Sequence, residues 1–192
     1  MLFRSGSVGK PLPGTSIRVS DAQTGEVHTS PDAIGVLEVR GPNVFAGYWR
    51  DDEMTRKEFT ADGWFKTGDL GRIDAEGYVH IVGRAKDLVI SGGYNVYPKE
   101  VEAELDALAG ILESAVFGVP HPDYGEGVTA AVVAKPGACL SEIDIMDSIK
   151  ARLARYKVPK RIILLEELPR NTMGKVQKST LRSAYAALYL EE

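Results

Sequence analysis

The pattern of the sequence changes near residues Gly83–Asp87, and this change limits the chain to two parts of different architecture. Before it, short runs of alternating apolar residues are separated by glycine and proline turns, as in the strand predicted over Gly35–Arg40, which ends at Gly41-Pro42. One short helix is predicted over Asp51–Phe59, because acidic residues occupy its first turn. The first part is therefore expected to be rich in β-structure, as a small β-barrel or part of one.

After the change, helical and strand patterns alternate. The spacing predicts the order β-α-β-β-α-β-α, with strands at Leu88–Ile90, Ser114–Val119, Val128–Ala134 and Arg161–Leu165, and with helices starting at Pro98, after Ser141 and over Thr180–Leu190. This order predicts an α+β fold with a small sheet flanked by helices. Domains are expected over residues 1–85 and 86–192, and the polar stretch between them is either a hinge or a plain turn.

Composition excludes several classes of protein. The net charge of −4 gives no indication of a nucleic-acid partner. Cys139 is the single cysteine, so a disulfide framework is excluded and a reducing compartment is favoured. The first residues lack the apolar run of a signal peptide, and no stretch has the ~20 apolar residues of a membrane span. A cytoplasmic location is therefore expected, without a membrane span.

Three short segments could carry chemistry, and each has a simpler structural interpretation. Asp69, after Thr67-Gly68, could accept hydrogen bonds from the two hydroxyls of a ribose, or it could bond the backbone of its own turn. Gly92-Gly93 could let a ligand approach the backbone, or could form a tight turn. Lys175, after Gly174, could neutralise negative charge when a carboxylate attacks a phosphate, or could be a solvated surface lysine.

Metal and nucleophile sites are not predicted. His28, His80 and His121 lie far apart and lack the spacing of metal ligands, and Cys139 has no partner motif.

Taken together, five segments in this order resemble the adenylate-forming family of acyl-CoA synthetases, luciferases and peptide-synthetase adenylation domains. These segments are Gly41–Tyr48, Trp64–Gly71, Gly77–Asp87, Ser91–Glu102 and the loop Pro169–Lys178 that carries Lys175. The resemblance covers nearly the whole chain. Within the family the chain looks most like malonyl-CoA synthetases, on the runs Gly92–Glu100, Gly118–His121 with Gly125–Thr129, and Leu168–Lys178.

This resemblance implies a reaction in two steps. A carboxylate first attacks the α-phosphate of ATP to give an acyl-adenylate and pyrophosphate, and the thiol of CoA then displaces AMP. By similarity, Asp69 holds the ribose hydroxyls with help from Arg84, and Lys175 is the catalytic residue of the first step. Lys86 would be the hinge about which the C-terminal lid domain, residues 86–192, rotates between the two steps.

The resemblance also implies a CoA site. Gly92 and Gly93 would border the pantetheine tunnel after the rotation, and Tyr124 and Tyr156 match aromatic positions that can stack on the adenine of CoA.

The segments that the family uses for the rest of the chemistry are expected upstream, in an N-terminal domain of the same enzyme. They are the phosphate loop, the glutamate that binds Mg²⁺, and the pocket that recognises the acid. On this interpretation residues 1–85 are the last part of the large adenylation domain, the chain by itself is inactive, and an exposed apolar surface marks the docking site of the N-terminal domain. The complete enzyme would use ATP, CoA and Mg²⁺ to activate malonate or a similar short acid, in fatty acid metabolism.

Two other functions stay open. A peptide-synthetase adenylation domain would load a carrier protein, although the chain ends at Glu192 without a carrier module, which favours free CoA. A non-catalytic binding module is the third hypothesis, because no phosphate loop occurs in the sequence.

Overall fold

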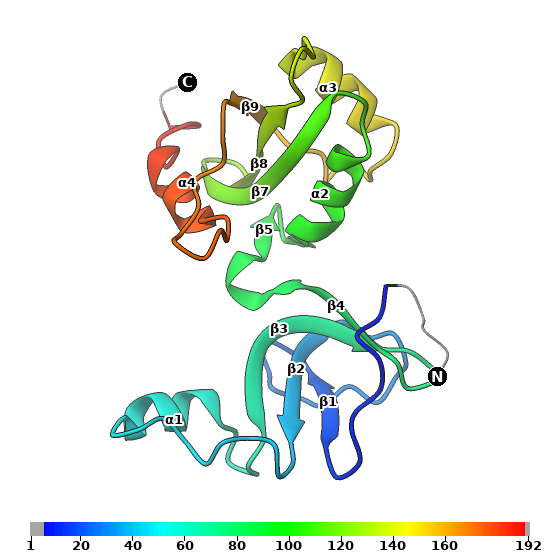
Figure 1. The fold of residues 1–192 in the computed structure, drawn as a ribbon, viewed down its shortest axis with the longest axis vertical. Coiled ribbons are helices and arrows are strands. Elements are labelled where there is room, and N and C mark those ends of the chain that lie inside the picture. Colours follow the sequence, from blue (N-terminus) through cyan, green and yellow to red (C-terminus); the bar gives the residue numbers. More distant parts are fainter. Residues whose placement is uncertain (1–5, 191–192) are drawn as a thin grey trace. The chain divides into compact units, whose positions relative to one another are not determined.

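The computed structural model describes residues 6–190, and the chain divides into two compact units, Met1–Lys86 and Asp87–Glu192 (Figure 1). The first unit contains an antiparallel sheet and one helix, and the second contains a mixed sheet and three α-helices. The expected α+β class is confirmed. Within residues 6–190, no helix is both long enough and apolar enough to cross a membrane.

The sheet of the first unit follows the order of the chain. Its strands are β1 (Ser16–Ser20), β2 (Gly35–Arg40), β3 (Phe65–Ile73) and β4 (Val79–Arg84), and each pairs with the next in antiparallel register. The sheet is open, with β1 and β4 at the two ends of this order. Its core is small and is formed by Val19, Leu37 and Val79, with Ile17 and Ile73 packed against them.

The predicted short helix is α1 (Asp52–Glu58), which begins after the N-cap Asp51. The Asp51 carboxylate accepts a hydrogen bond from the backbone N–H of Met54 at 2.9 Å, so one of the unpaired N–H groups of the first turn is satisfied. Next to this helix, the ring of Phe45 makes edge-to-face contacts with Tyr48, Phe59 and Phe65.

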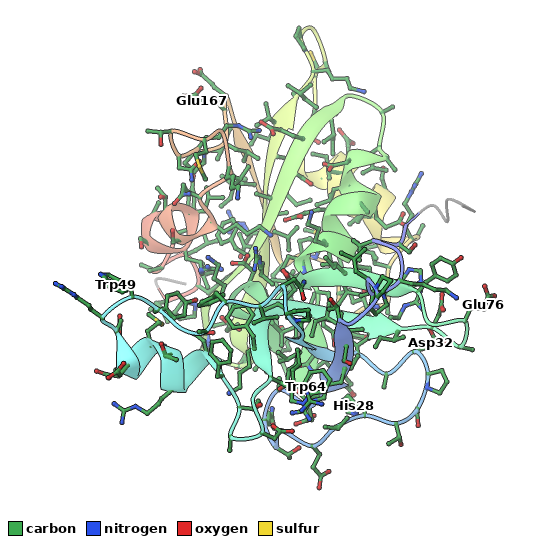
Figure 2. The ribbon with its side chains drawn as sticks, turned by 60° about the horizontal axis from the view of Figure 1, so that its bottom comes forward. His28, Asp32, Trp49, Trp64, Glu76 and Glu167 are labelled. Atoms are coloured by element: carbon green, nitrogen blue, oxygen red, sulfur yellow. The ribbon has the colours of Figure 1, made fainter. Side chains whose placement is uncertain are left out.

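Several large apolar side chains of the first unit are exposed. They are Val8, Leu12, Val27, Ile34, Phe45, Tyr48, Trp49, Met54 and Ile81. Trp49 is 87% exposed, and Figure 2 shows its side chain pointing away from the ribbon. The docking of an N-terminal domain on an exposed apolar surface stays a prediction.

The sheet of the second unit is built around a long hairpin. Strands β7 (Ile111–His121) and β8 (Gly125–Ala134) pair in antiparallel register and run longer than the sequence pattern predicted. The opposite edge of β8 pairs in parallel with β9 (Arg161–Leu165), and β5 (Val89–Ser91) meets β8 where Ser91 pairs with Gly125. Strand β6 (Tyr94–Val96) pairs with β5 at the edge of the sheet.

Helices cover both faces of this second sheet (Figure 1). Helices α2 (Pro98–Asp106) and α3 (Glu142–Lys150) contribute Val101, Leu105, Ile145 and Ile149 to a core that also contains Val116, Val128 and Val132 from the sheet. Helix α4 (Lys178–Ala184) contributes Leu181 to a second core with the alternate strand residues Ala115, Phe117, Ala131 and Val133. Because side chains alternate across a strand, these two cores lie on opposite faces of the sheet.

The tight turn offered as one interpretation of Gly92-Gly93 is present, because these residues, with φ of +58° and +80°, form the two-residue turn of a hairpin between β5 and β6. One expectation for this unit is wrong, since the predicted helix Thr180–Leu190 ends at Ala184 and turns follow. The chain leaves the helix and buries the ring of Tyr189 against Gly127, where a Cβ atom would lie 2.4 Å from that ring.

Candidate functional site

In the first unit, Asp69 and Arg84 lie together. They are register partners on β3 and β4, and Arg84 Nε lies 3.1 Å from Asp69 Oδ1. The guanidinium also donates to the Thr67 carbonyl at 3.2 Å, while the Asp69 N–H donates to Thr67 Oγ1 at 3.1 Å. The Asp69 side chain is 23% exposed, so the carboxylate is held in one orientation and is still open to solvent. A carboxylate in this state can accept hydrogen bonds from two neighbouring hydroxyls.

Lys86 is the last residue of the first unit and lies within the short 3-10 turn Ala85–Asp87. Its side chain is exposed. The next residue belongs to the second unit and is fixed there, because Arg182 of α4 donates a hydrogen bond to Asp87 Oδ1 at 3.1 Å.

In the second unit, three of the four residues expected to bind CoA line one pocket. Gly92, Tyr124 and Tyr156 form its wall together with Ser91, Tyr94, Arg155 and Lys160, around a volume of about 360 Å³. The Gly92 N–H donates to the Tyr124 carbonyl at 2.9 Å, which ties the β5–β6 turn to the end of the β7–β8 hairpin. The fourth residue, Gly93, completes the turn and is not part of the pocket wall.

The wall of this pocket contains three tyrosine rings and two cations. Tyr94 and Tyr156 stack, with ring centroids 4.8 Å apart and an interplanar angle of 29°. Lys160 Nζ lies 4.5 Å from the centroid of the Tyr124 ring. Such walls suit a flat ring system that carries negative charge.

Two of the cations at the pocket have no carboxylate partner. Within residues 6–190, Arg155 and Lys160 form no ion pair, whereas the neighbouring Lys157 pairs with Glu100 at 2.5 Å, and this hydrogen bond raises the pKa of the Lys157 ammonium. Arg155 and Lys160 also line a second pocket, of about 550 Å³, between α3 and the segment that leads to β9. Unpaired cations shared by two adjoining pockets favour an anionic ligand.

Lys175 lies on a tight hairpin loop between β9 and α4, outside both pockets. Its side chain is exposed, and its ammonium has no ion-pair partner in the described part of the chain. The ammonium is therefore free to contact a ligand from outside its own unit.

Sequence reasoning missed Tyr94, Arg155 and Lys160 as pocket residues. Tyr94 lies within the resemblance segment Ser91–Glu102, but no role was predicted for it. For the two cations a signal existed, because the segment from Arg152 to Arg161, both included, contains five basic residues in a chain of net negative charge. In the described residues, no group of three or more His, Cys, Asp or Glu side chains is arranged to hold a metal ion.

Comparisons with known proteins show which proteins this chain is similar to. Residues 100–175 match the family model of the AMP-binding enzyme C-terminal domain, and residues 2–49 match the model of the AMP-binding enzyme. A 3-[(3aS,4S,7aS)-7a-methyl-1,5-dioxo-octahydro-1H-inden-4-yl]propanoyl:CoA ligase from Rhodococcus jostii is 48% identical over 91% of this chain and 32% of its own length. Other curated relatives are CoA ligases named for different acids, such as indoleacetate and sulfoacetate.

Solved structures give the same result. ATP-bound MatB from Rhodopseudomonas palustris is 56% identical, with a TM-score of 0.91 over 96% of this chain and 36% of its own. The o-succinylbenzoate CoA synthetase MenE from Bacillus subtilis, in complex with an acyl-adenylate intermediate, is 37% identical, with a TM-score of 0.84 over 92% of this chain and 35% of its own. The chain thus spans about a third of the length of the relatives that it matches. Segments of both units therefore match models of AMP-binding enzymes, and the chain is similar to about a third of the length of several CoA ligases.

Proposed function

We propose that the chain is the C-terminal part of an ATP-dependent acyl-CoA synthetase. The enzyme joins a carboxylate to the α-phosphate of ATP with release of pyrophosphate, and the sulfur of CoA then attacks the acyl carbon with release of AMP. The observation that carries this proposal is the pocket of stacked tyrosines and unpaired cations in the second unit. A pocket of this kind fits the adenine and phosphates of CoA.

Each candidate residue has a role in this proposal. Asp69 accepts the ribose hydroxyls of ATP, and Arg84 keeps the carboxylate oriented. Lys175 neutralises charge between the attacking carboxylate and the α-phosphate in the first step. Lys86 is the pivot, since it is the exposed residue at the junction of the two units.

The CoA site combines predicted and newly found residues. Tyr124 and Tyr156 contact the adenine, Arg155 and Lys160 pair with phosphates, and the Gly92-Gly93 turn borders the pantetheine arm without side chains in its path.

Malonate or a similar short carboxylic acid is the proposed substrate. Support comes from the three sequence runs that resemble malonyl-CoA synthetases. The relatives are about three times as long as this chain, so the acid pocket, the phosphate loop and the Mg²⁺-binding glutamate are assigned to an N-terminal domain of the complete enzyme. The described residues offer no cluster that would hold Mg²⁺, and no step is assigned to a metal held by them.

The complete enzyme, incubated with ATP, Mg²⁺, CoA and a panel of carboxylic acids, is expected to form AMP, pyrophosphate and a CoA thioester, with malonate or another short acid preferred. The 192-residue chain alone is expected to form none of them. Acyl-adenylate that is transferred to a carrier protein and not to CoA would overturn the proposal in favour of a peptide-synthetase adenylation domain. A complete absence of ATP-dependent turnover would favour a binding module.

Replacing Lys160 with alanine in the complete enzyme is expected to raise the KM for CoA about tenfold, since a charge-assisted bond to a phosphate is lost. Pyrophosphate exchange, which does not involve CoA, should keep its rate. Steady-state kinetics with CoA and with dephospho-CoA measure the effect and identify the phosphate. Lys135→Ala, at an exposed lysine in a turn of the same unit, is the matched control. An unchanged KM for CoA in Lys160→Ala would contradict the proposal that CoA binds in this pocket.

A further inference from the structure

The backbone on both sides of Lys175 is held by one residue, Asn171, through its side chain and its own backbone. Asn171 Oδ1 accepts the N–H of Lys175 at 2.9 Å and the N–H of Met173 at 3.1 Å, and the Asn171 N–H donates to the Lys175 carbonyl at 2.9 Å. Gly174 takes the left-handed conformation that the turn requires, with a φ of +76°. The loop is thus a compact turn around Asn171, although its residues are largely exposed.

A second side chain fastens this turn to the sheet. The guanidinium of Arg170 donates to the Gly174 carbonyl at 2.7 Å through one terminal nitrogen and forms an ion pair with Glu113 of β7 through the other. Arg170 also forms an isolated antiparallel bridge with Val176, so the loop is closed at its base. Glu113 is held in β7 by its pairing with Val133 of β8. The carbonyl before Lys175 is therefore connected through two side chains to the central hairpin of the unit.

The planar shape of the Arg170 side chain lets it hold the loop and the sheet together. A guanidinium presents donors in fixed directions and can serve two acceptors at once, whereas a lysine ammonium is a point charge on a flexible stem. The pair is partly solvated, with side-chain exposures of 43% for Arg170 and 29% for Glu113. Ion pairs of this kind contribute little to the stability of a fold, so the effect of this pair is expected on the geometry of the loop.

We propose that Glu113 and Arg170 are positioning residues for the first half-reaction, because they fix the backbone from which Lys175 extends toward the nucleotide. This inference rests on the proposed function. Small displacements of a catalytic group are costly to the rate even when the fold is intact. In the second half-reaction, where Lys175 has no role, the pair should have no effect.

The test uses the complete enzyme with the substitutions Glu113→Ala, Arg170→Gln and Arg170→Lys. Each is expected to lower the kcat of acyl-adenylate formation about tenfold, measured by pyrophosphate exchange. Thioester formation from supplied acyl-adenylate should stay within about twofold of the parent enzyme. Arg170→Lys should lower this kcat nearly as much as Arg170→Gln does, since a lysine ammonium cannot reproduce the two fixed donor directions of the guanidinium. The double variant Glu113→Ala/Arg170→Gln should be no slower than Arg170→Gln alone, because both substitutions break one connection.

Glu104→Ala is the matched control. Glu104 forms a half-exposed ion pair with Arg152 in the same unit, at 3.4 Å, and this pair has no connection to the Lys175 loop. Equal loss in both half-reactions, or loss in neither, would overturn the positioning role. Lys175→Ala, measured in parallel, separates the two proposals. If Lys175→Ala blocks the first step and Glu113→Ala does not, the positioning role alone fails, whereas an unaffected Lys175→Ala contradicts the proposed function itself.

Discussion

Replacing Lys175 with alanine in the complete enzyme is expected to lower the rate of acyl-adenylate formation by about 10²–10³-fold, the range found when one preorganised donor to a developing charge is removed. The Lys175 ammonium is exposed and has no counterion within residues 6–190, so its charge is available for a phosphate. Its neighbours on the loop are already paired, since Arg170 contacts Glu113 and Lys178 contacts Glu102. Pyrophosphate exchange measures this step.

The second half-reaction gives the internal control for Lys175. Thioester formation from supplied acyl-adenylate should be unchanged, because the proposal gives Lys175 no part in it. Circular dichroism of the variant should match that of the parent, since an exposed side chain is removed. Lys135→Ala should leave both half-reactions intact. A variant that loses both half-reactions to the same extent would contradict the role of Lys175.

Replacing Arg18 with methionine is expected to lower the free energy of unfolding of the first unit by about 3 kcal/mol, the lower part of the range for breaking a buried ion pair. Arg18 Nε donates to Glu38 Oε2 at 2.6 Å, and Glu38 is 2% exposed. Without Arg18, the carboxylate keeps a hydrogen bond from Ser20 Oγ at 2.8 Å but has no charge partner. Urea unfolding followed by tryptophan fluorescence measures the loss in this unit, because both tryptophans of the sequence, Trp49 and Trp64, lie in it.

The arrangement around Arg18 supplies two controls. The double variant Arg18→Met/Glu38→Met removes both charges and should recover part of the lost stability.

Asp62 supplies the second control, because its hydrogen bonds with Arg18 hold the pKa of the Asp62 carboxyl at about 2, below its usual 3.8. A carboxyl with a lowered pKa in the folded state stabilises the fold above its ordinary pKa, and this contribution is lost as the pH falls from about 4 toward 2. Arg18→Met should lack that acid-dependent component, and equal stability of parent and variant at pH 7 would refute the buried pair.

The ring of Trp64 lies against Arg18, the arginine of this ion-pair network. The guanidinium groups of Arg18 and Arg40 lie over its ring, with distances of 4.4 Å and 4.7 Å to the centroid. Trp64 is 9% exposed, and in Figure 2 it lies beside β1, in contrast to the outward-pointing Trp49. Trp64 lies in one of the resemblance segments, and local patterns gave no sign of these contacts, because they join residues 46 and 24 positions apart in the sequence.

Local patterns were sufficient for many of the elements. Strands β2 and β9 have the predicted bounds, and α3 begins after the predicted cap, where Ser141 Oγ accepts the N–H of Asp144 at 3.2 Å. These features depend on neighbours within four residues or on the alternation of side chains along one strand. The end of α4 could not be predicted in this way, since it depends on the space that Gly127 leaves for Tyr189, 62 positions further along the chain.

The candidate site likewise contains features that short sequence segments indicated and contacts that only folding creates. The sequence by itself determined the residue types, the Asp69, Arg84 and Lys175 motifs and the α+β class, because each of these can be recognised from the residues of short, continuous segments. The tertiary structure decided that Tyr94, Tyr124, Arg155, Tyr156 and Lys160 surround one pocket, and that Glu113 fastens the Lys175 loop. Those contacts join residues from different strands and loops. Their distances are set by the pairing of β5, β7, β8 and β9, and this pairing cannot be read from the spacing of residues within one segment.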